Sequence, residues 1–179
     1  MKKLLGILSL VLASLVMGNA YAALPEITEP VFEKGDLVGS LTIGYGWGFS
    51  QRLALEYAVA DGWLDGRASL GVGGALGNCF RSYGWGYILD ELSLGAICSF
   101  HYQFIDKLDT YAQLGLGVGY AIYSWNDNYW GSYTAGNHAF FDFTGSLGVR
   151  YYFTPKFAVN GELGYTAGSY IMAGVSYKF

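Results

Sequence analysis

From about residue 37 onward, apolar residues alternate with polar or very small ones along the chain. In the segment FFDFTGSLGVRYYF at 140–153, large apolar side chains occupy one set of alternate positions, while Asp142, Ser146 and Arg150 belong to the other. A period of two is typical of β-strands whose two faces meet different surroundings. No segment of useful length shows the period of a helix, so the pattern predicts an all-β protein.

The pattern divides into eight strand segments. They span residues 37–47, 50–60, 67–77, 88–104, 109–125, 138–153, 156–167 and 169–179. Compact connections such as TPK at 154–156 alternate with longer ones such as GNCFRSYGWG at 77–86 and NDNYWGSYTAGN at 126–137. Short turns at one end and longer loops at the other are typical of a transmembrane barrel. We therefore predict an eight-stranded antiparallel up-and-down transmembrane β-barrel over residues 37–179.

Composition favours a membrane over a soluble barrel. The chain is 53% hydrophobic, 18% aromatic and only 13% charged, about half the charge content usual in soluble domains. So few charges would not cover the outside of a soluble barrel. Aromatic residues also gather near both ends of the strands, as in the interfacial girdles of outer membrane barrels.

The first 22 residues predict a cleaved secretory signal peptide. A basic MKK start precedes the apolar run LLGILSLVLASLVMG, and the small residues of NAYA follow at once. This order places cleavage between Ala22 and Ala23; an uncleaved membrane anchor is the alternative. Residues 23–36 contain two prolines and four acids, and we expect them to form a mostly extended periplasmic arm.

The chain resembles the small eight-stranded outer membrane barrels of Gram-negative bacteria, of the OmpA/OmpX type. The signal segment, the eight amphipathic strands and the terminal GVSYKF carry this resemblance. It implies that the outer membrane assembly machinery reads a C-terminal signal. The residues that match this signal are Ala173, Val175, Tyr177 and Phe179. It also implies a monomer in contact with outer membrane lipid and lipopolysaccharide, with its tight turns in the periplasm and its longer loops outside.

The alternation directs one set of charged residues into the barrel lumen. The set consists of Arg52, Glu56, Arg67, Glu91, His101, Asp142, Arg150, Glu162 and Lys178. Eight strands leave an interior just wide enough for side chains to fill, and buried charges must pair. We expect a salt-bridge network that fills the lumen of a protein with a structural or surface-interaction role. A narrow gated channel for ions or small apolar solutes is the alternative.

Other kinds of function have weaker support in the sequence. Ser99 and His101 share a strand face, and His138 lies near the longest loop, but neither matches an enzyme motif, so a lipid-modifying enzyme is a distant alternative. The tyrosines and tryptophans of that loop favour recognition or contact with lipopolysaccharide headgroups. Eight basic residues against 14 acidic ones after signal removal argue against nucleic-acid binding.

No cofactor or metal site is expected from the spacing of the ligating residues. The two histidines and two cysteines have no ligand-like spacing, and the glycine runs lie within strands rather than before a helix. Cys79 is expected in an outer loop and Cys98 on the lipid face of the following strand. Because about ten residues of strand rise separate their levels, we predict no disulfide between them.

Overall fold

The protein is described by a computed structural model, which covers residues 25–83, 87–125 and 136–179. The predicted signal peptide and its Ala22–Ala23 cleavage site lie outside these described residues. The strands are β1 (Leu37–Gly46), β2 (Phe49–Gly62), β3 (Ala68–Tyr83), β4 (Tyr87–Ile105), β5 (Leu108–Trp125), β6 (His138–Tyr152), β7 (Phe157–Thr166) and β8 (Ser169–Lys178). A single short helical turn, α2 (Trp63–Gly66), connects β2 to β3.

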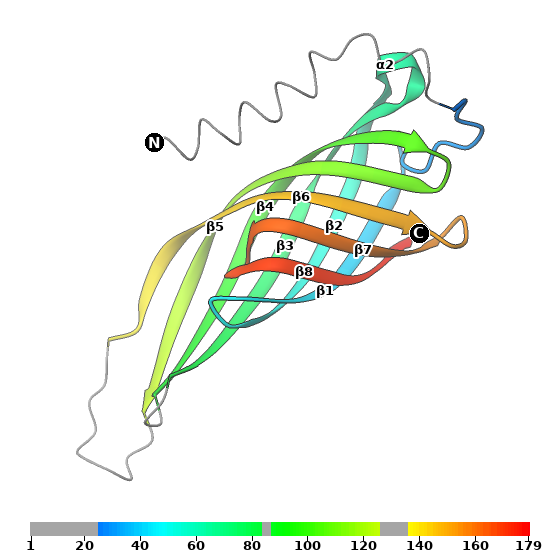
Figure 1. Ribbon diagram of the computed structural model, residues 1–179. Helices are drawn as coiled ribbons and strands as arrows, with labels where there is room; N and C mark the ends of the chain where they lie inside the picture. The colour runs from blue at the N-terminus through cyan, green and yellow to red at the C-terminus, as the bar shows by residue number, and fades with distance from the viewer. Residues whose placement is uncertain (1–24, 84–86, 126–135) are drawn as a thin grey trace, which may run out of the picture.

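The eight strands form a closed ring in which each strand pairs antiparallel with the next (Figure 1). The ring closes between β1 and β8, where Val38 lies opposite Lys178 and Leu41 lies opposite Val175. Beyond β8, the Phe179 N–H donates to the Leu37 carbonyl over 3.0 Å. The prediction of an eight-stranded antiparallel up-and-down barrel is confirmed. No described helix is long and apolar enough to span a bilayer.

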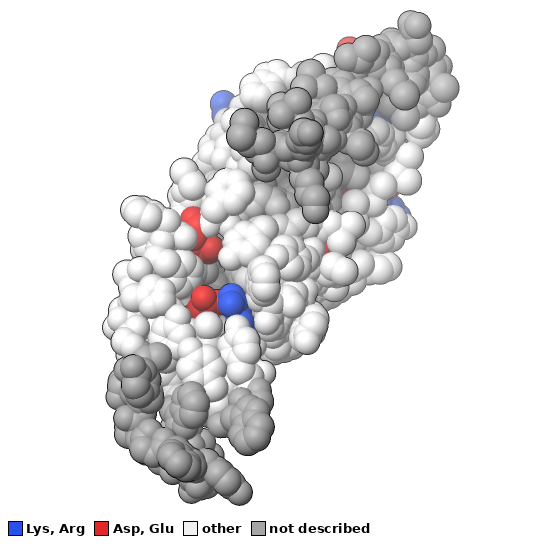
Figure 2. Space-filling model, turned by 60° about the vertical axis from the view of Figure 1, so that its left-hand side comes forward, with Lys and Arg blue, Asp and Glu red and all other residues white. Residues whose placement is uncertain are grey.

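The two faces of the wall are the reverse of those of a soluble protein. On β5, Leu114 is 63% exposed on the outside, whereas the neighbouring Gln113 is 3% exposed and points inward. The same alternation runs along β2, where Leu53 and Leu55 are exposed and Arg52 and Glu56 are buried. Figure 2 shows a face with few charged atoms, and those near its centre lie together in a hollow. An apolar outside around a polar inside is expected where lipid surrounds a barrel.

The two ends of the barrel differ in construction. The turn end carries α2, the connections at 106–107 and 153–156, and the C-terminus; the loop end carries the other four connections. At the loop end, β3 to β6 run past the remaining strands (Figure 1). Residues 81–83 of β3 pair only with β4, and residues 138–144 of β6 pair only with β5. We call this four-stranded projection the extension.

The extension corrects one sequence prediction. Residues 77–86 were expected to form a loop, but β3 continues to Tyr83 and β4 begins at Tyr87. Each residue from Gly77 to Tyr83 has a partner on β4, so strand pairing prevails over the glycine and asparagine content of this segment. Cys79 therefore lies in a strand and is buried, not in an outer loop.

The segment before β1 makes contacts that the sequence did not predict. Residues 25–36, which we call the arm, do not hang free but fold against the turn end, where Val31 and Phe32 are buried. The Gly35 N–H donates to the Ala58 carbonyl, and the Ala58 N–H donates to the Asp36 carbonyl. Burial of two apolar side chains and pairing with β2 explain why the arm docks rather than extends.

Candidate functional site

A cluster of four buried ionisable side chains lies in the lumen near the turn end. The His101 ring contacts two carboxylates, with Nδ1 2.9 Å from Asp109 and Nε2 2.9 Å from Glu56. The Arg150 guanidinium lies 3.1 Å from Asp109 and 3.3 Å from Glu56. The four residues come from β2, β4, β5 and β6, so the cluster bridges the lumen between opposite walls.

Charge balance offsets the cost of burying this cluster in the barrel. Both ring nitrogens of His101 face carboxylate oxygens, and only a doubly protonated imidazolium can donate from both. Two cations, His101 and Arg150, then balance two anions, Glu56 and Asp109. Because an unpaired buried ion costs several kcal/mol, each of these side chains depends on the others.

A second buried cluster lies one layer closer to the loop end. Arg52 contacts Glu162 over 3.3 Å and also donates to the Gln113 side-chain oxygen. The Tyr111 hydroxyl donates to Glu162 over 2.9 Å. The Arg150 guanidinium lies 4.9 Å from the centre of the Tyr111 ring, which joins the two clusters by a cation–π contact. The lumen from the turn end to this layer, here called the turn half, is therefore filled by one connected polar network.

The arm covers part of the turn half from outside. The Phe32 ring lies 4.1 Å from the His101 ring, between centroids. The Val31 N–H donates to the Gln103 side chain over 3.0 Å, and Lys178 donates to the Val31 carbonyl and to Asp36. A cavity of about 170 Å³ remains between the arm and the β2–β3 connection, and it reaches His101 and Asp109. The arm thus packs on the ionic cluster through Phe32 and covers part of the turn end, while a cavity beside it still reaches the cluster.

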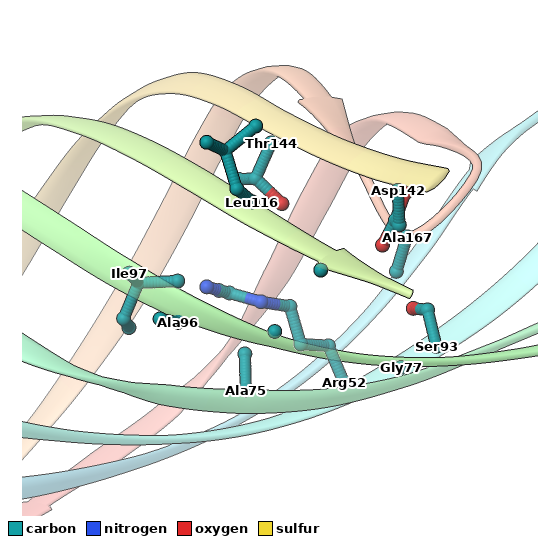
Figure 3. A pocket seen from close by; sticks show the side chains of 12 residues that line it. Arg52, Ala75, Gly77, Ser93, Ala96, Ile97, Leu116, Asp142, Thr144 and Ala167 are labelled. Atoms are coloured by element: carbon teal, nitrogen blue, oxygen red, sulfur yellow. The ribbon is translucent and has the colours of Figure 1, made fainter. Parts of the chain in front are cut away.

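The rest of the lumen, the loop half, is lined by small residues. Gly77, Ser93, Gly95 and Gly117 surround a cavity of about 10 Å³ (Figure 3), a volume that holds about one water molecule. Figure 3 shows Arg52 entering this space from one wall and Asp142 beside Ala167 at its rim. A β-carbon on Gly77 would lie 2.6 Å from the Ala167 methyl, so the β7–β8 turn reaches across the lumen to β3.

Five of the nine residues predicted for the lumen network lie in the two clusters. These five are Arg52, Glu56, His101, Arg150 and Glu162. The other four lie at the ends or the rim. Arg67 donates to backbone oxygens of Pro25, Gln103 and Phe104, Lys178 contacts Asp36, Glu91 pairs with Arg81, and Asp142 lines the small cavity.

The sequence prediction missed three residues of the network. Asp109 is 1% exposed and contacts both His101 and Arg150, and Tyr111 and Gln113 bind the second cluster. Asp109 was placed at the first position of the 109–125 strand and left out of the lumen set, although it has the same alternation as Tyr111 and Gln113. Extending the alternation two residues back would have placed it in the lumen.

The geometry does not assemble the proposed catalytic pairs. Ser99 accepts a hydrogen bond from Gln113, while both nitrogens of His101 bind carboxylates, so His101 is not poised as a base for Ser99. His138 stacks on Tyr123, and the upstream loop residues Asp127 and Ser132, which could have completed a site with it, lie outside the described residues. Among the described residues, no group of three or more His, Cys, Asp or Glu is arranged to hold a metal ion, and both cysteines are free.

The residues of the predicted assembly signal share one face of the barrel. Ala173, Val175, Tyr177 and Phe179 are all exposed on the outer, apolar side of the wall. The Tyr177 and Phe179 rings meet edge to face, with 5.2 Å between centroids. This position suits contact with lipid; recognition by the assembly machinery stays a prediction.

Comparison with known proteins identifies the fold. No protein-family model and no curated protein matches this chain. Among solved structures, the attachment invasion locus protein Ail of Yersinia pestis is 14% identical, with a TM-score of 0.50, and the match covers 82% of this chain and 99% of Ail. A de novo designed transmembrane β-barrel is 20% identical, with a TM-score of 0.51, and the match covers 82% of this chain and 98% of the design. The chain therefore has the fold of the small eight-stranded transmembrane β-barrels.

Proposed function

We propose that this protein is an integral outer membrane β-barrel that does not conduct, with a structural or surface-interaction role. The observation that carries the proposal is the buried network of the turn half, in which Glu56, Asp109, His101 and Arg150 neutralise one another across the lumen. The arm covers this network at one end, and the β7–β8 turn narrows the lumen at the other. An ion would have to break several of these contacts to pass.

The proposed orientation follows from the two ends of the barrel. The turn end has short connections and holds the arm, whereas the loop end carries the extension and the longest connection. In outer membrane barrels, short turns lie in the periplasm and longer loops lie outside. The turn end would then face the periplasm, and the extension would project from the cell. Lipid and lipopolysaccharide would surround the apolar wall.

Single-channel recording tests the proposal. The full chain is refolded into a planar bilayer after heat-dependent migration on a gel has shown that it is folded. We expect no discrete conductance steps from inserted protein. Reproducible steps from the wild type would contradict the proposal and favour the small-channel alternative, for which the cavity of about 170 Å³ beside the arm is the supporting observation.

A further inference from the structure

An aromatic row crosses all four strands of the extension. The Tyr83 and Tyr87 ring centroids lie 5.4 Å apart, those of Tyr87 and Tyr123 lie 5.9 Å apart, and those of Tyr123 and His138 lie 5.7 Å apart. The contributing strands are β3, β4, β5 and β6 in order, so the row is continuous from one edge of the extension to the other. Rings from four separate strands are brought together only by the barrel fold.

The row lies on the face of the extension that continues the lumen wall. Side chains alternate along a strand, so Tyr83 shares its face with Arg81 and the buried Cys79, and Tyr123 shares its face with the buried Ala121. The apolar outer face of the wall is on the opposite side of the extension, where Phe141 is 93% exposed. Tyr83 and His138 are themselves exposed at the two edges of the row. These rings are thus directed away from the lipid.

The fixed charges beside the row cancel. Arg81 and Glu91, the charged residues of this face at the level of the row, pair with each other. Asp142 lies on the same face but four residues deeper than His138, where it lines the small cavity. The Arg81 guanidinium also lies 5.9 Å from the centre of the Trp47 ring. Asp90, which is close by in sequence, belongs to the opposite face and contacts Asn78. A sulfated polymer would find no net positive charge beside the row. A polycation would find no net negative charge there either, because the remaining carboxylate of this face, Asp142, lies deeper.

We propose that the aromatic row and the Arg81–Glu91 pair form a binding site for an uncharged, soluble oligosaccharide. The apolar faces of sugar rings stack on aromatic faces, while sugar hydroxyls exchange hydrogen bonds with a guanidinium, a carboxylate and phenolic hydroxyls. The neutral site matches a neutral ligand. A glycan free in the medium reaches the inner face directly, whereas one anchored in the membrane would have to cross the rim of the extension. The inference deepens the proposed surface-interaction role and rests on it.

Calorimetric titration of the full chain in lipid nanodiscs tests the site. The probes are linear hexasaccharides of glucose and of mannose, with a heparin hexasaccharide and an oligolysine as charged comparisons. We expect at least one neutral probe to bind more tightly than either charged one. Binding of only a charged probe, or of none, overturns the proposal. If the protein binds sugar only when lipopolysaccharide in the nanodisc carries it, the ligand is a membrane-anchored glycan, and the proposal of a soluble oligosaccharide is wrong.

Variants separate the aromatic row from the rest of the surface. Tyr123→Ala removes the ring that contacts both neighbours and should weaken binding of the neutral probe about tenfold, a typical loss for one stacking ring. Tyr123→Phe should retain most of the binding because it keeps the ring. Phe141→Ala, on the opposite face of the same sheet, should change the affinity less than about twofold. Equal losses in Tyr123→Ala and Phe141→Ala would overturn the site.

The titration distinguishes failure of this inference from failure of the proposed function. Each variant is first shown to be folded by heat-dependent migration on a gel. A wild type that is silent in the planar bilayer but binds none of the probes overturns only the oligosaccharide site. A wild type that conducts overturns the closed barrel, whatever the titration shows.

Discussion

The turn half of the lumen is filled by long charged side chains, whereas the small cavity of the loop half is lined mostly by glycine, alanine and serine. In the turn half, Arg52, Glu56, Arg150 and Glu162 each reach across to another strand. In the loop half, Gly77, Gly95 and Gly117 leave the space to Asp142 and to the β7–β8 turn. The same eight strands thus enclose two interiors of different chemistry.

This difference assigns stability mainly to the turn half and recognition to the loop end. The turn-half network couples five strands, β2, β4, β5, β6 and β7, through ion pairs and hydrogen bonds, so it fixes the cross-section of the barrel. The loop half contributes few such contacts and leads into the extension, whose aromatic row is partly exposed. Changes in the turn half should therefore alter stability and closure, and changes at the loop end should alter binding.

The largest expected effect comes from breaking the turn-half network. Arg150→Met removes one cation and leaves the Glu56 and Asp109 carboxylates buried with only His101 to balance them. Breaking a buried pair in this way costs about 3–5 kcal/mol. The free energy of unfolding in urea, followed by tryptophan fluorescence in lipid vesicles, should fall by that amount.

Arg81→Met is the matched change at the loop end. It also removes an arginine from an ion pair, but the Arg81 and Glu91 side chains are 15% and 19% exposed, so water can solvate the remaining carboxylate. We expect a loss of about 1 kcal/mol or less. Equal losses for Arg150→Met and Arg81→Met would remove the energetic distinction between the two halves.

The sequence was sufficient to predict the wall of the barrel but not the contents of the lumen. Alternation with a period of two depends only on neighbours along one strand, so the sequence was sufficient to place Arg52, Glu56 and Arg150 inside. It does not give the level of each residue along the barrel axis. Lys178 has the correct face, yet it lies at the turn end beside Asp36 rather than in a cluster.

The docking of the predicted arm and the presence of the extension were missed for a related reason. Phe32 lies in a segment whose prolines and acids predict an extended arm. The His101 ring becomes its contact partner only when the strands have closed into the ring. The segment 77–83 reads as a loop because of its glycine and asparagine, although β4 supplies a pairing partner for each residue. Both features depend on contacts between distant segments, and strand register is needed to foresee them.

A smaller effect is expected from loosening the arm. Phe32→Ala removes the ring that packs on His101, and deleting a buried phenylalanine side chain costs about 3 kcal/mol. Since the arm can open without unfolding the barrel, this cost should appear as local opening. Trypsin cleavage after Lys34 should accelerate about 100-fold, because cleavage follows the open population.

Leu64→Ala is the control for the arm experiment. Leu64 lies in α2 at the same end of the barrel, but its side chain is 46% exposed, so its removal should leave the cleavage rate nearly unchanged. The same Phe32→Ala protein placed in a planar bilayer shows whether the arm alone blocks conduction. Continued silence with fast cleavage would mean that the ionic network of the turn half closes the lumen without the arm.

The smallest effect is expected from a single exposed contact between the arm and the β4–β5 turn. Asp106 accepts hydrogen bonds from the Thr28 hydroxyl over 2.7 Å and from the Thr28 N–H over 3.0 Å, and these bonds lower the pKa of the Asp106 carboxyl below its ordinary value. A lowered folded-state pKa means that the contact is complete above the ordinary aspartate pKa of about 3.9 and is lost as the pH falls through the folded value. The chemical shift of the Thr28 amide proton should therefore titrate with a midpoint below that of a free aspartate. Asp106→Asn should abolish this titration of the Thr28 amide shift. The control Asp65→Asn, in α2, should leave it unchanged. A titration midpoint at or above the ordinary aspartate pKa would show that the Thr28–Asp106 contact does not hold the arm in solution.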